Sequence, residues 1–213
     1  MKALKLIAVL VTAVSLAGCA SIDTPSRNAP FAQGAEGTSV NFAQTGAVFE
    51  AADADYRVAQ INVIVPRTLQ VSEANSYKPR GDIVWRGDLP GDRHAQVKAI
   101  FEEALARGAN GVNGSVPVVL DIEVTRFHAL TEKTRYSVGG VHEIEFILSM
   151  RSAETGLLLK QPRKVQADLV GHGGQRAIEE ESRGLTQKVS ITNHLAQMIR
   201  TELTQPEGFQ DVK

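Results

Sequence analysis

Alternation of apolar and polar residues predicts the first strand of the chain. In residues 57–65 (RVAQINVIV), apolar side chains recur at every second position, and Pro66 follows directly. A period of two places these side chains on one face of a strand, and proline lacks the N–H group that a continuing strand needs. We therefore expect a strand over residues 57–65 whose apolar face carries Ala59, Ile61, Val63 and Val65.

A helical period begins after Asp92. Apolar residues recur there at spacings of three and four, which form the stripe of an amphipathic helix: Val97, Ile100, Phe101, Ala104 and Leu105. Aspartate is favoured at the N-cap because its carboxylate accepts a backbone N–H. We expect Asp92 to begin this helix and Gly108 to lie just past its end in the left-handed conformation.

Three strands that form a meander are expected next, in residues 116–130, 141–151 and 157–170, because each segment alternates. If the apolar faces of the first two strands coincide, the numbers of paired residues must have an even sum. A sum of 270 gives the pairs Val124 with Phe146, Ile122 with Leu148, and Leu120 with Met150.

A long amphipathic helix is expected over residues 175–203. Its apolar residues repeat at spacings of three and four from Leu185 to Leu203, and Pro206 ends it. Gly184 lies inside this pattern and costs about 1 kcal/mol relative to alanine. A kink or a second helix start at Gly184 is therefore an open alternative.

The order of strand, helix, three-strand meander and long C-terminal helix predicts an α+β fold with a mainly antiparallel sheet. The helices then pack on one face of the sheet. We expect one domain over residues 56–204 and a loose tail over residues 205–213. Residues 19–55 are rich in small and polar residues and predict a flexible tether, although Phe42, Val48 and Phe49 leave partial docking onto the domain open.

The amino terminus has the order of a secretory signal peptide. Lys2 and Lys5 precede an apolar run of residues 6–16, which is shorter than the roughly 20 residues that span a bilayer. The sequence Leu16-Ala17-Gly18-Cys19 then resembles the lipobox of bacterial lipoproteins. This resemblance implies a signal peptide over residues 1–18, cleavage between Gly18 and Cys19, a diacylglycerol on the Cys19 sulfur, and acylation of the new amino terminus, for instance by palmitate.

The lipobox resemblance also implies a location. Two or more buried acyl chains hold a protein stably on a membrane. In the sorting rule of enteric bacteria, an aspartate after the lipidated cysteine retains the protein in the inner membrane, whereas this chain has Ala20. We therefore expect a lipid-anchored protein of the cell envelope, at the outer membrane and facing the periplasm. Cys19 is the only cysteine, so no disulfide can form within the chain.

Charge argues against one class of partner. The chain has 23 Lys and Arg against 24 Asp and Glu, and no basic stripe of the kind that nucleic-acid-binding domains carry. We expect no nucleic-acid partner and no cofactor beyond the covalent lipid on Cys19.

Two histidines form the first candidate site. The register above places His128 opposite His142, and cross-strand neighbours have Cβ atoms about 5 Å apart, close enough to share a metal or a small ligand. His172, in the turn before the last helix, is a candidate third member. The alternative is that each histidine binds backbone or water, since no cysteine or further firm ligand completes a zinc-type set.

Aromatic residues form the second candidate site. Trp85 is the only tryptophan, and with Tyr77 it is a candidate for a partner-binding surface. The alternative is that Trp85 packs in the core at the edge of the sheet.

Two segments carry a family resemblance, namely SYKPRGDIVWRGDLPGDRH (residues 76–94) and FHALTEKTRYSVGGVHEIEF (residues 127–146). They resemble a family of small alphaproteobacterial lipoproteins of unknown function. More loosely, the order of lipobox, tether, strand, helix, meander and helix looks like the auxiliary lipoproteins of envelope ABC transport systems that move lipids.

These resemblances imply a binding component of an envelope complex, engaged in transport or lipid trafficking, with an envelope protein as its partner. An enzyme is not expected, because no nucleophile or acid–base pair can be assembled from the sequence. The alternative function is a periplasmic module that binds a small ligand or metal through His128 and His142.

Overall fold

The computed structural model describes residues 55–210. The predicted signal peptide, Cys19 and the predicted tether up to residue 54 lie outside the described residues, as does the end of the tail at residues 211–213. Among residues 55–210, no helix is both long and apolar enough to cross a membrane.

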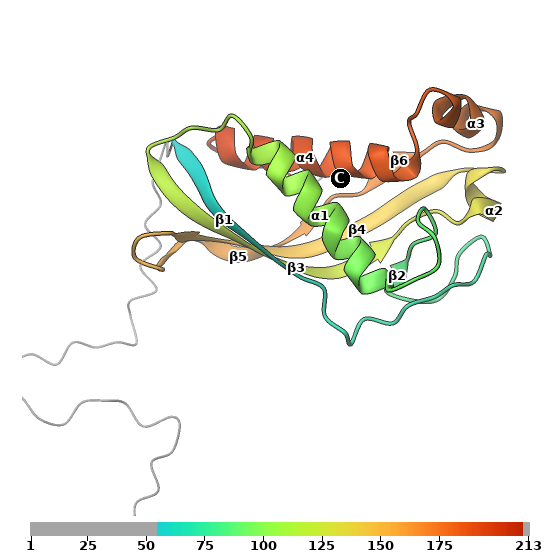
Figure 1. Cartoon of the computed structure of the whole chain (residues 1–213), viewed down its shortest axis with the longest axis horizontal. Coiled ribbons are helices and arrows are strands. Elements are labelled where there is room, and N and C mark those ends of the chain that lie inside the picture. The colour runs from blue at the N-terminus through green and yellow to red at the C-terminus, as the bar shows by residue number, and fades with distance from the viewer. Residues whose placement is uncertain (1–54, 211–213) are drawn as a thin grey trace, which may run out of the picture. The chain divides into compact units, whose positions relative to one another are not determined.

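Six strands and four helices follow one another along the described chain (Figure 1). In order they are β1 (Tyr56–Ile64), β2 (Ile83–Val84), α1 (Arg93–Ala109), β3 (Val116–His128), α2 (Glu132–Arg135), β4 (Gly140–Ser152), β5 (Leu158–Gln166), β6 (Leu169–Gly171), α3 (Gly174–Ser182) and α4 (Gln187–Thr204).

The sheet has the order β1-β3-β4-β5. Strands β3, β4 and β5 form the antiparallel meander, whereas β1 and β2 lie parallel to β3 along its other side. Helices α1 and α4 pack against each other on one face of this sheet (Figure 1). The α+β fold class is confirmed, with a mainly antiparallel sheet and helices on one face.

The core lies between the two long helices and the sheet. Three phenylalanines from α1, β3 and β4 stack in series at its centre, with Phe101 contacting both Phe127 and Phe146 at ring-centroid distances of 6.2 and 5.4 Å. Asp92 is the N-cap of α1 as predicted, and its side chain accepts the N–H of Ala95. The 3.6-residue period therefore located the start and the buried stripe of α1 correctly.

Gly108 has a different role from the one predicted. It lies inside α1, where a Cβ atom would come within 2.1 Å of Ile199 Cγ2 and 2.4 Å of the Ala196 carbonyl oxygen on α4. The absent side chain thus permits close approach of the two helices rather than a left-handed turn. The left-handed residue beyond α1 is Gly111, with φ of 78°.

The register of β3 and β4 is confirmed in its central part, where Leu120, Ile122 and Val124 pair with Met150, Leu148 and Phe146. Beyond Val124 a β-bulge shifts the register by one residue, so that His128 pairs with Glu143. The prediction that His128 lies opposite His142 is therefore wrong. A bulge adds one unpaired residue to one strand only. A constant sum of paired residue numbers cannot include this added residue.

The C-terminal part of the chain is more divided than predicted. Helix α3 ends at Ser182, Gly184 has φ of 80°, and Thr186 caps a new helix by accepting the N–H of Val189. The alternative of a second start near Gly184 is thus the correct one. The expected third meander strand is divided as well, because the Asp168 carboxylate takes the N–H of Ile144 at 2.9 Å between β5 and β6.

The segment after α4 contacts the domain up to residue 210. Glu202 is buried and binds Lys160 at 3.2 Å, Arg163 at 2.7 Å and the Phe209 N–H at 2.8 Å. Phe209 also packs against the core. Residues 205–210 are therefore attached to β5 through a buried carboxylate, in contrast to the loose tail that we predicted.

Candidate functional site

The three candidate histidines each have a separate partner. His128 Nε2 lies 3.0 Å from the Pro79 carbonyl oxygen, His142 Nδ1 accepts the Leu130 N–H at 3.3 Å, and His172 Nδ1 lies 2.6 Å from Glu180. Within residues 55–210, no group of three His, Cys, Asp or Glu side chains is arranged to hold a metal ion. The structure thus gives no support to a shared metal or ligand site at these residues.

His142 is buried in the core. Burial, and then the positive charge of Arg135 and the neighbouring His194, lower the pKa of His142 from 6.5 to about 4. The imidazole is therefore neutral at physiological pH and acts as an acceptor for the backbone of Leu130.

Trp85 is fully buried, so it cannot form the partner surface that we considered. Its ring packs edge-on against Phe127, with 5.7 Å between the ring centroids, and its indole N–H donates to Asp88 at 2.8 Å. A buried indole needs such an acceptor. Tyr77, by contrast, is exposed, and the Lys133 ammonium lies 4.6 Å from the centre of its ring.

On the face of the sheet away from α1 and α4, several charged side chains are paired with one another. Asp121 binds Arg151 at 2.6 Å and Asn62 at 2.8 Å, while Glu145 binds Lys164 at 2.7 Å. The hydrogen bond from Arg151 keeps the pKa of Asp121 below its ordinary value against the opposing effect of burial. These carboxylates are held ionised by structural ion pairs, which gives none of them the raised pKa of a general acid.

The two edges of the sheet differ in how they are protected. Natural proteins guard edge strands with lysine, proline and bulges, because unpaired N–H and C=O groups invite another strand. Edge strand β5 has all three devices, with Lys160, Pro162, Lys164 and two register shifts. Edge strand β1 (YRVAQINVI) has one bulge at Ala59 but neither lysine nor proline. Among the described residues no strand pairs with the outer edge of β1, the edge that faces away from β3.

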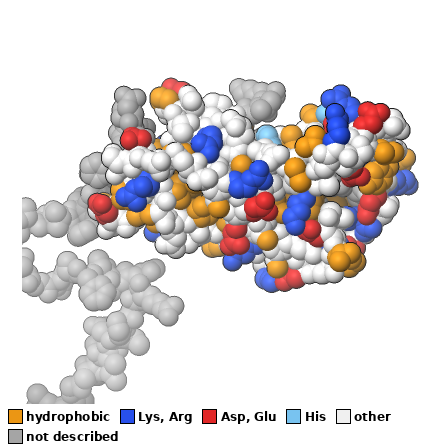
Figure 2. Space-filling view, turned by 45° about the horizontal axis from the view of Figure 1, so that its top comes forward, with side chains coloured by type: hydrophobic (Ala, Val, Ile, Leu, Met, Phe, Trp, Pro, Cys, Tyr) orange, Lys and Arg blue, Asp and Glu red, His pale blue; other side chains and the backbone are white. Residues whose placement is uncertain are grey.

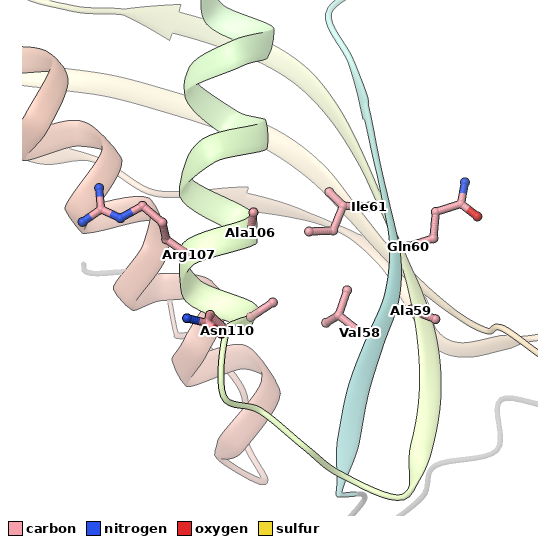
Figure 3. A pocket seen from close by; sticks show the side chains of 8 residues that line it. Val58, Ala59, Gln60, Ile61, Ala106, Arg107 and Asn110 are labelled. Carbon is pink, nitrogen blue, oxygen red and sulfur yellow. The ribbon is translucent and has the colours of Figure 1, made fainter.

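A shallow groove of about 530 Å³ lies between this free edge and α1 (Figure 3). Val58 and Ile61 project from β1 toward Ala106 on the helix, while Ala59 and Gln60 lie on the other side of the strand. The bulge therefore exposes Ala59, which we had assigned to the buried face. A row of main-chain groups beside small apolar side chains is suited to an added strand.

The sequence alone did not identify this edge. Alternation predicts that residues 57–65 form a strand but does not place the strand within the sheet. The contrast between a strand without lysine or proline and a strand with both is readable from the sequence once the order is known.

Comparison with known proteins gives a family and structural similarity to solved chains. A family model described as a family of unknown function (DUF6778) matches residues 56–213. No curated protein matches the sequence significantly. A crystal structure of a candidate lipoprotein from Caulobacter crescentus CB15 is similar, with 12% identity, a TM-score of 0.29, and coverage of 68% of this chain and 87% of that one.

Proposed function

The chain belongs to the DUF6778 family of unknown function, and from this premise we propose that it is a lipid-anchored envelope protein that binds a protein partner without catalysing a reaction. The anchor is Cys19, and the binding site is the free edge of β1 with the groove beside it. The edge of β1, which has neither lysine nor proline, is the observation that carries the binding function.

The anchor is supported by the sequence before the domain. Positive residues, an apolar run, small residues and then a single cysteine occur in the order that lipoprotein processing requires. Ala20 after Cys19 supports the outer membrane, facing the periplasm. A diacylglycerol and an added acyl chain then hold the protein on the lipid, because one chain alone binds only marginally.

The binding site is supported by the chemistry of β1. A partner strand that pairs with the outer edge of β1 satisfies the main-chain groups of both chains. Its side chains alternate, so that one set fills the groove beside Val58, Ile61 and Ala106 and the other set lies near Gln60. The occupant that fits is an extended segment with small or medium apolar residues at every second position.

A binding function without catalysis is supported by how the charged groups are used. Each carboxylate whose pKa is lowered is bound to an arginine or a lysine. Asp92 binds Arg67 and also caps α1. The more specific role, as an accessory component of a transport or lipid-trafficking complex, depends on the resemblance to auxiliary lipoproteins of envelope ABC systems.

Site-specific photo-crosslinking in intact envelopes tests this proposal. A photoreactive residue at Ala59 on the free edge is compared with one at Gln161 on the guarded edge, since both positions are exposed. We expect a discrete adduct with another envelope protein from Ala59 alone, and its loss in the Gln60→Lys variant, which adds the lysine that edge strands use for protection.

Three results would contradict the proposal. Equal adducts from both positions would indicate random contact with abundant proteins. A self-adduct from Ala59 would identify a second copy as the occupant, and a loop within one chain would identify its own amino-terminal segment. The Cys19→Ala variant is the control for the anchor, and we expect it to lose the Ala59 adduct together with its membrane attachment.

A further inference from the structure

The loop of residues 75–82 is exposed, yet buried side chains fix its backbone. Three of them bind carbonyl groups of the loop: Thr131 Oγ1 donates to Ser76 at 2.8 Å, Thr134 Oγ1 donates to Tyr77 at 2.9 Å, and His128 Nε2 donates to Pro79 at 3.0 Å. All three donors are buried. Buried hydroxyl and imidazole groups need partners, and here their partners hold an exposed loop in one conformation.

The other side of the loop is also fixed. The Asp82 N–H donates to the Gln70 carbonyl at 2.8 Å, and the Asp82 carboxylate accepts the Gln70 N–H at 2.8 Å. Gly81 has φ of 152°, and a Cβ atom there would lie 3.0 Å from Ser72 Cβ. The loop thus packs tightly against residues 70–72.

A hollow of about 630 Å³ lies under this loop, lined by Gln70, Lys78, Pro79, Arg80, Gly81, Asp82 and Arg126. Three of the lining residues are cationic and one is acidic. Arg80 is exposed and makes no hydrogen bond or ion pair with any described residue. On the face drawn in Figure 2, Lys and Arg side chains are interspersed with Asp and Glu side chains.

Glu143 is the counter-ion of this cluster. Its carboxylate binds Lys78 at 3.1 Å and the Arg126 Nε at 2.8 Å. Although burial alone raises the pKa of Glu143, the hydrogen bonds from Arg126 and Lys78 outweigh that effect and keep the pKa below its ordinary value. Three cations, Lys78, Arg80 and Arg126, are thus balanced by two carboxylates, Glu143 and Asp82, which leaves one net positive charge in the hollow.

We propose that the hollow under the 75–82 loop binds a phosphate-bearing anion, with Lys78 and Arg80 as its main contacts and Arg126 at its base. Guanidinium and ammonium groups are the usual partners of phosphate oxygens in proteins. The source of the phosphate is either the headgroup of an anionic lipid or a small free phosphate compound. Exposed Tyr77 beside these cations fits a lipid surface, where aromatic and basic side chains gather.

Four variants of the full lipidated chain in non-ionic detergent test the site by titration with inorganic phosphate. Arg80→Ala and Lys78→Ala each remove one exposed cation, and we expect affinity to fall about two- to fivefold. Glu143→Gln removes the competing carboxylate, and we expect affinity to rise about two- to fivefold. Arg57→Ala is the matched control, because Arg57 is also an exposed arginine without a described partner but lies on β1.

A second arm distinguishes the two sources. The lipidated chain is reconstituted in vesicles of phosphatidylcholine, with and without phosphatidylglycerol, and hydrogen exchange is measured at the amides of residues 76–82. Slower exchange with phosphatidylglycerol that Arg80→Ala abolishes identifies a lipid headgroup. A response to inorganic phosphate without this protection identifies a free phosphate compound. Equal behaviour of Arg80→Ala and Arg57→Ala in both arms, or weaker binding by Glu143→Gln, overturns the proposal.

Discussion

Acid destabilises this domain through a buried histidine that cannot take up a proton without cost. His142 is 1% exposed, and its pKa is about 4 instead of 6.5. The unfolded chain binds a proton at this residue as the pH falls below 6.5, whereas the folded chain does not until about pH 4. Stability that is fully present above pH 6.5 is therefore lost progressively between pH 6.5 and about pH 4. The loss levels off below about pH 4.

The size of this effect follows from the two pKa values. At about pH 4.5 the unfolded state gains about 2.5 kcal/mol relative to the folded state from His142 alone. Burial lowers the pKa of His194 as well, so this neighbour contributes in the same direction. With a urea m-value of about 2 kcal/mol/M for a domain of this size, the loss from His142 shifts the unfolding midpoint by about 1 M.

Urea unfolding at a series of pH values measures this loss, with His142→Asn as the comparison. The asparagine carbonyl oxygen can accept the Leu130 N–H in place of His142 Nδ1 but does not titrate. The variant is expected to be less stable at pH 7, since it packs less well, but its stability changes less between pH 6.5 and 4. All other titrating groups are shared and cancel in the difference between the two proteins.

Parallel pH profiles of the two proteins would refute this reasoning. They would mean that His142 titrates equally in the folded and unfolded states and is not the buried neutral acceptor that the geometry indicates.

Three further substitutions test the packing of the domain. Glu202→Gln removes the buried charge that binds Arg163, and we expect a loss of about 2 kcal/mol in urea unfolding together with faster hydrogen exchange at residue 209; unchanged exchange there would contradict the attachment of residues 205–210. Gly108→Ala forces a methyl group into α4 and should cost about 2 kcal/mol in thermal unfolding, whereas an unchanged midpoint would show that the helices separate freely. His128→Ala should speed amide exchange in residues 76–82 without unfolding the sheet, and equal exchange would show that the loop holds its shape unaided.

Local periodicity predicted the elements because each buries one face. The stripe of α1, its Asp92 cap and the central register of β3 and β4 all follow from which side chains must leave water. Periodicity did not predict the bulge after Val124. One added residue leaves the alternation on either side of the bulge intact, although the register beyond it is shifted. The candidate pair His128 and His142 was lost with that single shift.

Long-range features could not be predicted in this way. The parallel pairing of β1 with β3, and therefore the position of β1 at an edge, depends on strand order. The role of Gly108 depends on the approach of α4, which is distant in the sequence. The 75–82 loop has no period, and its conformation is set by donors from β3 and α2. The resemblance over residues 76–94 drew attention to this segment without indicating what it does.

The predicted lipid on Cys19 is the premise that places the proposed binding edge and the proposed phosphate site at a membrane. Mass spectrometry of the mature amino-terminal peptide tests it directly. We predict a peptide that begins at Cys19 and carries the mass of a diacylglyceryl group and an added acyl chain. A mature chain with a free thiol at Cys19, or one that begins at another residue, would contradict the account.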